Sequence, residues 1–256
     1  MNCPYCNTEV PANREICPNN DCYRPLKPIP IPPNGKVQFG GYDWYVLEKQ
    51  DGKMLLLTEK IIGRRAYHNR VENITWETCD MRKYLNGEFY NSFNETDRKR
   101  IVEVMNDNPA NPWYGTSGGN PTADKIFLLS IAEVMKYFGD SGLCENRPIE
   151  GPCDWCNDEY WPWLSGDEYD INRRAVDNTG MVMSWRLRSP GANGRCVAFV
   201  MGNCWDEFEH GGIGMAGGGG ELTPEKHFVF DNLDTLTISD NDHNINGVRP
   251  ALWLKD

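Results

Sequence analysis

SWRLRSPG at residues 184–191 and GVRPALWL at residues 247–254 are the stretches that decide the fold of this chain. Each combines tryptophan, arginine and proline, whereas residues 192–246 between them are rich in glycine, asparagine and aspartate. A guanidinium offers five donors in a fixed geometry, so we expect Arg188 and Arg249 to pair with buried carboxylates or carbonyls. The alternative is that either arginine binds an anionic ligand. The two stretches therefore predict a scaffold that brackets exposed loops.

The residues before this scaffold predict a β-hairpin. Residues 37–39 and 43–47 have the composition of strands, and residues 54–58 have that of a returning strand. Asp51-Gly52 between them is a typical hairpin turn, because both positions favour a positive φ. We therefore expect a meander at the start of the main domain.

Three helices are predicted from their polar caps and apolar spacing. The first covers residues 78–86, with one apolar face made of Met81, Tyr84 and Leu85. Asn94 caps the second, whose inward face is expected to consist of Ile101, Val104 and Met105. A buried strand at 126–129 leads into the third, in which Ser130 and Glu133 form a capping box. Early helices and later short strands indicate an α+β class.

Several stretches of the chain carry a resemblance to a known family. They read GYDWYVL at 41–47, TWETCDMRKYLN at 75–86, DKIFLLS at 124–130, RLRSPG at 186–191 and GVRPALWL at 247–254. Together they resemble bacterial and phage domains of unknown function with a C-type-lectin-like fold. Relatives of those domains include formylglycine-generating-enzyme-like domains and the variable proteins of diversity-generating retroelements. The resemblance implies a C-type-lectin-like domain over residues 35–256, in which the two chain ends of the domain meet.

The sequence departs from that family pattern in two places. Trp185-Arg186 stands where a double tryptophan is usual, and residues 202–246 form a longer segment than expected. Both differences leave the alignment of the last third open.

The N-terminal residues 1–24 predict a zinc ribbon. CPYC at 3–6 and CPNNDC at 17–22 supply Cys3, Cys6, Cys17 and Cys22, and four thiolates close a tetrahedral zinc shell. The second spacing is wider than the usual two residues, and two disulfides or free thiols are the alternatives. So short a segment cannot bury a core, so bound Zn²⁺ would supply its folding energy. A complete shell leaves no position for water, which predicts a structural role.

Residues 25–34 predict a stiff linker. They contain five prolines, which favour extended polyproline II. We expect this linker to hold the ribbon away from the main domain, residues 35–256.

Composition and charge narrow the function classes. Lys and Arg total 26 and Asp and Glu 37, and the net charge of -11 opposes binding to nucleic acid. No apolar run approaches the about 20 residues of a membrane helix, and no signal peptide is evident. The paired cysteine spacing favours metal in a reducing compartment. We expect a cytoplasmic protein, which could also enter a phage particle.

The loops after residue 191 are the predicted ligand-binding region. By analogy with retroelement variable proteins, we expect the ligand-binding surface to expose Asn193, Arg195, Asn203, Trp205, Asp206, Glu207, Phe208, Glu209 and His210. Calcium is a weaker expectation at Asp240, Asp242 and Asn244, because oxygen side chains alternate there. Such runs are also common turns. The glycine-rich residues 211–220 are expected to form a flexible loop or tight backbone packing.

The remaining cysteines leave other functions open. CDWC at 153–156, with Cys144 nearby, could form half of a second zinc site. Cys196 and Cys204 suggest a copper oxidase of the formylglycine-generating type, since soft thiolates select Cu(I). However, their surroundings do not match the motif of that enzyme.

The function expected from these observations is a non-enzymatic binding or display protein. Its ligand is expected to be a protein, with a glycan as the second choice, and a retroelement-diversified variable protein is one form of it. The alternatives are the copper oxidase and a regulatory adaptor, in which the ribbon binds a partner and the domain is a scaffold.

Overall fold

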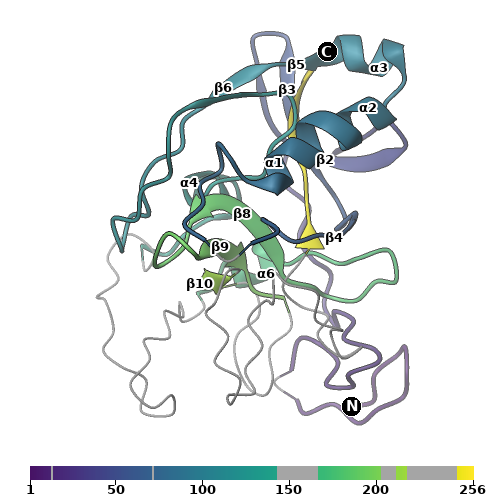
Figure 1. Cartoon of the computed structure of the whole chain (residues 1–256). Coiled ribbons are helices and arrows are strands. Elements are labelled where there is room, and N and C mark those ends of the chain that lie inside the picture. The colour runs from purple at the N-terminus through teal and green to yellow at the C-terminus, as the bar shows by residue number, and fades with distance from the viewer. Residues whose placement is uncertain (13, 71, 143–166, 203–211, 218–246) are drawn as a thin grey trace.

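The computed structural model describes residues 1–256 except 13, 71, 143–166, 203–211 and 218–246 (Figure 1). Within these residues the fold is mixed α+β, as predicted, with two five-stranded sheets, one two-stranded sheet and short helices. The N- and C-termini lie at opposite ends of the molecule in Figure 1.

The first sheet has the strand order β1-β2-β3-β12-β5. Its strands are β1 (Lys36–Phe39), β2 (Tyr42–Gln50), β3 (Lys53–Thr58), β12 (Ala251–Lys255) and β5 (Ile101–Val102). The predicted hairpin is confirmed: Asp51 and Gly52 have φ of 52° and 67°, which suits a type I′ turn. Because β12 pairs with β3, the first and last strands of the main domain share one sheet, as expected.

The second sheet has the order β10-β9-β8-β11-β4. Its strands are β10 (Ile213–Gly217), β9 (Val197–Val200), β8 (Trp185–Pro190), β11 (Gly247–Val248) and β4 (Gly63–Arg64). Part of the glycine-rich stretch is therefore an edge strand and not a flexible loop. A Cβ on Gly214 would lie 2.4 Å from the ring of Phe199, so this glycine allows close packing.

Six short helices complete the described fold, with a third, two-stranded sheet. The helices are α1 (Asp80–Tyr84), the π-helical turn η1 (Leu85–Phe89), α2 (Tyr90–Ser92), α3 (Glu95–Arg100), α4 (Ile131–Phe138) and α6 (Asp170–Arg173). The third sheet pairs β6 (Val104–Asn106) with β7 (Thr122–Asp124). The predicted caps are confirmed: the side chain of Asn94 accepts from Asp97 N, and Ser130 and Glu133 form the capping box.

The extent predicted for the helix after Asn94 is wrong. The helix ends at Arg100, because Ile101 pairs with Leu254 of β12 and enters the first sheet. Val104 then begins β6, and Met105 is 67% exposed instead of facing inward. Strand pairing with distant residues therefore overrides the local helical spacing.

The predicted strand at 126–129 is buried but is not a regular strand. The backbone of Phe127 exchanges two hydrogen bonds with Ala251, of 2.9 and 2.7 Å, as an isolated bridge. All four residues of this segment are buried. The segment thus lies beside β12 at Phe127 and leads into α4.

Candidate metal centre

The first cysteine pair lies in a tight turn. Cys3 N donates to Thr8 O at 2.8 Å, and Asn7 N donates to Cys3 O at 2.9 Å. Asn7 completes this turn with a φ of 61°, which asparagine tolerates better than most residues. The turn directs the thiols of Cys3 and Cys6 to the same side.

The second pair lies in a matching turn despite its wider spacing. Cys17 N donates to Arg24 O at 3.0 Å, and Cys22 N donates to Asn19 O at 2.9 Å. The side chain of Asn19 accepts from Asp21 N at 2.9 Å, which closes the additional residues into an Asx turn. The extra length therefore does not separate Cys17 from Cys22.

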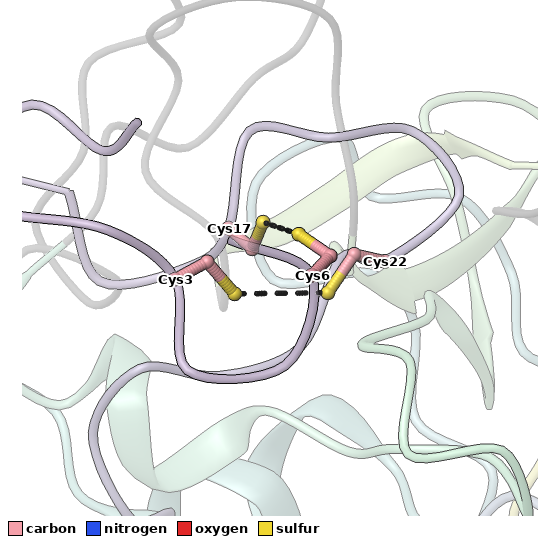
Figure 2. Close-up of side chains that lie close together, drawn as sticks. All are labelled: Cys3, Cys6, Cys17 and Cys22. Atoms are coloured by element: carbon pink, nitrogen blue, oxygen red, sulfur yellow. Dashed lines mark hydrogen bonds between the residues drawn. The ribbon is translucent and has the colours of Figure 1, made fainter. Parts of the chain in front are cut away.

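The four sulfur atoms converge on one point between the two turns (Figure 2). All ligand atoms of Cys3, Cys6, Cys17 and Cys22 lie within 4.8 Å of one another. The distance is 3.5 Å between the sulfurs of Cys6 and Cys17 and 3.9 Å between those of Cys3 and Cys22. A tetrahedral site with Zn–S bonds of about 2.3 Å places its sulfurs about 3.8 Å apart. The four cysteines could therefore hold a metal ion.

The distances between the sulfur atoms do not fit disulfide bonds among these four cysteines. A disulfide needs sulfurs about 2.0 Å apart, and all four of these cysteines are free thiols. Three of them, Cys3, Cys17 and Cys22, form most of the local core, together with Val10 and with Leu26 packed against them. In this N-terminal module, residues 1–26, the cysteines that could hold a metal ion are thus also most of the core.

The electrostatic surroundings of the thiols differ. The hydrogen bond with the Thr8 hydroxyl lowers the pKa of Cys6, the exposed member, to about 6. Burial raises the pKa of Cys17 and of Cys22, because desolvation disfavours a thiolate. Metal binding requires deprotonated thiols. A divalent cation at their centre would supply the positive charge that the buried pair lacks.

The N-terminal module rests against the main domain. Glu15 pairs with Arg174 at 2.8 Å, and Arg174 is only 6% exposed. Val182 N donates to Tyr23 O at 3.0 Å. The expectation that the linker holds this module away from the domain is therefore wrong. The position of the N-terminal module on the domain is set by this ion pair and this backbone hydrogen bond. The proline content of the linker carries no information about such contacts.

Two of the predicted ligand-binding residues lie in the described part of the chain. Asn193 and Arg195 are exposed in the connection between β8 and β9, where Asn193 Oδ1 accepts from Arg195 N at 2.9 Å. Cys196 follows at intermediate exposure, and burial raises its pKa. Outside the described residues lie Asn203, Trp205, Asp206, Glu207, Phe208, Glu209, His210, Asp240, Asp242, Asn244, Cys144, Cys153, Cys156 and Cys204.

Arg188 and Arg249 of the bracketing stretches serve as scaffold. Arg249 Nε donates to Thr58 O at 3.0 Å, and its guanidinium lies 4.8 Å from the Trp185 ring centroid. Burial lowers the pKa of Arg249 to about 10, so it remains charged at neutral pH. Arg188 donates to Leu128 O and to the carboxylate of Glu133. The predicted pairing with carbonyls and a carboxylate is confirmed.

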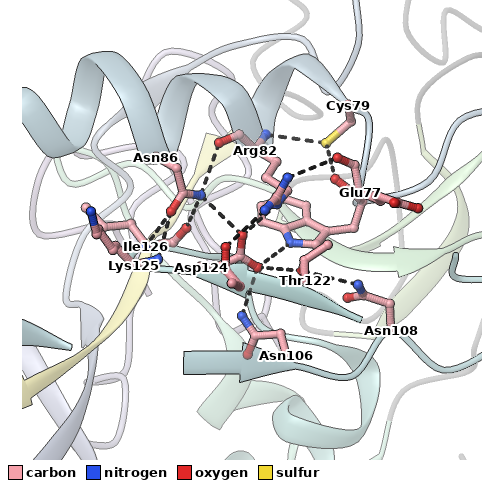
Figure 3. Close-up of polar contacts among 12 residues, drawn as sticks. Glu77, Cys79, Arg82, Asn86, Asn106, Asn108, Thr122, Asp124, Lys125 and Ile126 are labelled. Atoms are coloured by element: carbon pink, nitrogen blue, oxygen red, sulfur yellow. Dashed lines mark hydrogen bonds and ion pairs between the residues drawn. The ribbon is translucent and has the colours of Figure 1, made fainter. Parts of the chain in front are cut away.

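A buried carboxylate explains two of the stretches that carry the resemblance (Figure 3). Asp124 is fully buried and accepts from Trp76 Nε1 at 2.9 Å, from Arg82 Nε at 2.6 Å and from Asn106 Nδ2 at 3.0 Å. Asn86 adds contacts to the backbone next to it, accepting from Lys125 N at 2.8 Å. These residues tie α1 and η1 to the small sheet. The network around Asp124 has a structural role, and no local sequence signal identifies it.

No helix within the described ranges is long and apolar enough to cross a membrane.

Comparison with known proteins places the chain in a family. Residues 51–256 match the family described as Domain of unknown function (DUF6273), and the chain belongs to that family. No curated protein matches the chain. No solved structure matches it either.

Proposed function

We propose that this member of the DUF6273 family is a zinc-stabilised, non-enzymatic binding protein. The observation that carries the proposal is the convergence of Cys3, Cys6, Cys17 and Cys22 within 4.8 Å. Four soft donors at tetrahedral separation favour Zn²⁺ over the oxygen-seeking cations. The module is then a zinc ribbon, and its metal is structural, because four protein ligands leave no position for a substrate.

For the main domain we propose a C-type-lectin-like fold that binds its ligand through the loops after β8. Two observations support this: the first and last strands of the domain lie in one sheet, and Arg188 and Arg249 donate to backbone carbonyls inside the scaffold. An arginine that already donates to backbone carbonyls is poorly available to a ligand. The exposed Asn193 and Arg195 are the described residues through which we propose contact with a protein ligand.

The copper oxidase remains the weaker alternative. Cys196 is a free thiol whose pKa is raised, first of all by burial, whereas a Cu(I) ligand must be a thiolate. Incubation with Cu(I), oxygen and a cysteine-containing peptide separates the two functions. We expect no oxidation above that of a Cys196→Ser variant, and a clear difference between the two proteins would favour the oxidase.

Elemental analysis tests the zinc part of the proposal. The full chain is purified without added metal, as wild type, as Cys3→Ser/Cys6→Ser and as Cys196→Ser. We expect one zinc per chain in the wild type and in Cys196→Ser, and none in the double variant. Equal zinc in all three proteins would place the metal elsewhere.

Site-specific cross-linking tests the binding part. A photoreactive amino acid replaces Asn193, or Lys99 on α3 as a matched exposed control. We expect a protein adduct from position 193 that weakens when Arg195 is changed to Glu. Equal adducts from both positions would contradict a ligand surface beside β8 and β9.

A further inference from the structure

The four thiols of the N-terminal cluster are not equally accessible. Cys3, Cys17 and Cys22 are buried, whereas Cys6 is exposed. Among all the cysteines that the structure describes, Cys6 is the only one classed as exposed. A reagent that arrives from solvent therefore meets the sulfur of Cys6 first.

The sulfur of Cys6 makes a close contact with a sulfur in the other turn of the module. The Cys6 sulfur lies 3.5 Å from that of Cys17, and the second close pair is Cys3 with Cys22 at 3.9 Å. Thr8 connects the two turns beside this pair: its hydroxyl lies 3.3 Å from the sulfur of Cys6 and accepts from Asn19 Nδ2 at 3.1 Å. The geometry therefore favours a bond between the two turns over one within a CxxC turn.

We propose that Cys6 is the residue of this cluster that reacts first with a hydroperoxide, and that the product is a Cys6–Cys17 disulfide with release of the metal. This inference rests on the proposed zinc site. It adds a modification site and a class of co-substrate to a centre whose proposed role is structural.

The chemistry balances in two displacements. The sulfur of Cys6 attacks one oxygen of hydrogen peroxide, the O–O bond breaks, and hydroxide leaves, which gives a sulfenic acid. The sulfur of Cys17 attacks the sulfenic sulfur, the S–S bond forms, and the S–O bond breaks to release a second hydroxide. Two protons from solvent convert the hydroxides to water. The two thiolates lose two electrons in total, and the peroxide gains them.

Loss of two ligands removes the metal. Cys3 and Cys22 alone cannot complete a tetrahedral shell, so Zn²⁺ leaves. Tyr23, whose carbonyl accepts from Val182 N, directly follows Cys22. We therefore expect oxidation to weaken also the contact between the N-terminal module and the main domain.

Peroxide titration of the zinc-loaded full chain tests the proposal. Released zinc is followed with a chromophoric chelator, and the disulfides are mapped by mass spectrometry. We expect loss of one zinc per disulfide formed, with Cys6–Cys17 as the main product. Limiting N-ethylmaleimide should label Cys6 before Cys3, Cys17 or Cys22, and Cys196→Ser should behave as wild type.

The outcomes separate this inference from the proposed function. Stoichiometric zinc that survives excess peroxide, or a main product within one turn such as Cys3–Cys6, overturns the inference and leaves the zinc site intact. First labelling at a buried cysteine also overturns it. If the protein never binds zinc, both the proposed zinc site and the inference about Cys6 are overturned.

Discussion

In the N-terminal module the core cluster consists of Cys3, Val10, Cys17 and Cys22, whereas the main domain buries Trp44, Trp76 and Trp185 among many aliphatic residues. Burial of an aromatic or aliphatic side chain stabilises by about 1.5–3 kcal/mol, so the domain has a conventional hydrophobic core. Among its described residues the module has no comparable core. The difference supports our proposal that one chain combines a part that folds through apolar burial with a part that depends on a bound metal ion.

The largest expected effect is the selective loss of the module when metal is removed. Structural zinc supplies roughly 10–16 kcal/mol of apparent binding energy in zinc-finger peptides, and nothing in the module's core replaces it. With a strong chelator we expect backbone amides of residues 1–26 to lose hydrogen-exchange protection. Amides of β2 and β3 should keep theirs. Equal loss of hydrogen-exchange protection in both regions would contradict the prediction that only the module depends on metal.

The next effect concerns the domain alone. Changing Asp124→Ala leaves the buried donors of Trp76 and Asn106 without their acceptor and removes the partner of Arg82. Breaking a buried ion pair costs about 3–5 kcal/mol, so the unfolding midpoint in urea should fall strongly. Zinc content should not change. The exposed Glu95→Gln, which breaks the pair with Lys99, is the matched control and should have little effect.

A somewhat smaller effect is expected at Arg249. Arg249→Met removes the hydrogen bonds to Thr58 O and Glu59 O, and the cation next to Trp185. Each unsatisfied buried carbonyl costs about 1–3 kcal/mol, while the new apolar side chain compensates part of the loss. Urea denaturation measures the difference. If Arg249 instead bound an anionic ligand, the variant would be as stable as the wild type and would lose ligand affinity.

The smallest effect is a pH-dependent one at the contact between the two regions. The hydrogen bond from Lys27, followed by the contacts with Arg174, lowers the pKa of Glu15. A carboxyl group whose pKa is lowered in the folded state stabilises that state above its ordinary pKa, and this contribution disappears as pH falls through the folded value. We therefore expect Glu15→Gln to speed hydrogen exchange at Val182 N at neutral pH.

The same comparison in acid completes the test. Once Glu15 is protonated, wild type and Glu15→Gln should exchange at equal rates. At neutral pH the difference should correspond to less than about 1 kcal/mol, because Glu15 is partly exposed. A difference that grows toward acid would contradict the assigned contact.

Local patterns were sufficient to predict the features that depend on neighbours in sequence. The spacing of Cys3, Cys6, Cys17 and Cys22 predicted their cluster, Asp51-Gly52 predicted the hairpin, and Ser130 with Glu133 predicted a helix start. Each cysteine pair, the hairpin turn and the capping box is a signal of only a few consecutive residues.

Features that depend on distant partners could not be predicted in the same way. Ile101 leaves the expected helix because Leu254 pairs with it, and Glu15 meets Arg174 across most of the chain. Asp124 likewise gathers donors from separate elements. The residues of these contacts are ordinary in their local sequence, so only the fold reveals their roles.

X-ray absorption at the zinc edge tests the central claim most directly. The wild-type chain is purified without added metal and is compared with Cys3→Ser/Cys6→Ser. We predict a first shell of four sulfurs at about 2.3 Å in the wild type, and no bound zinc in the variant. A shell that contains nitrogen or oxygen, or zinc that remains in the variant, would contradict a module held together by these four thiolates.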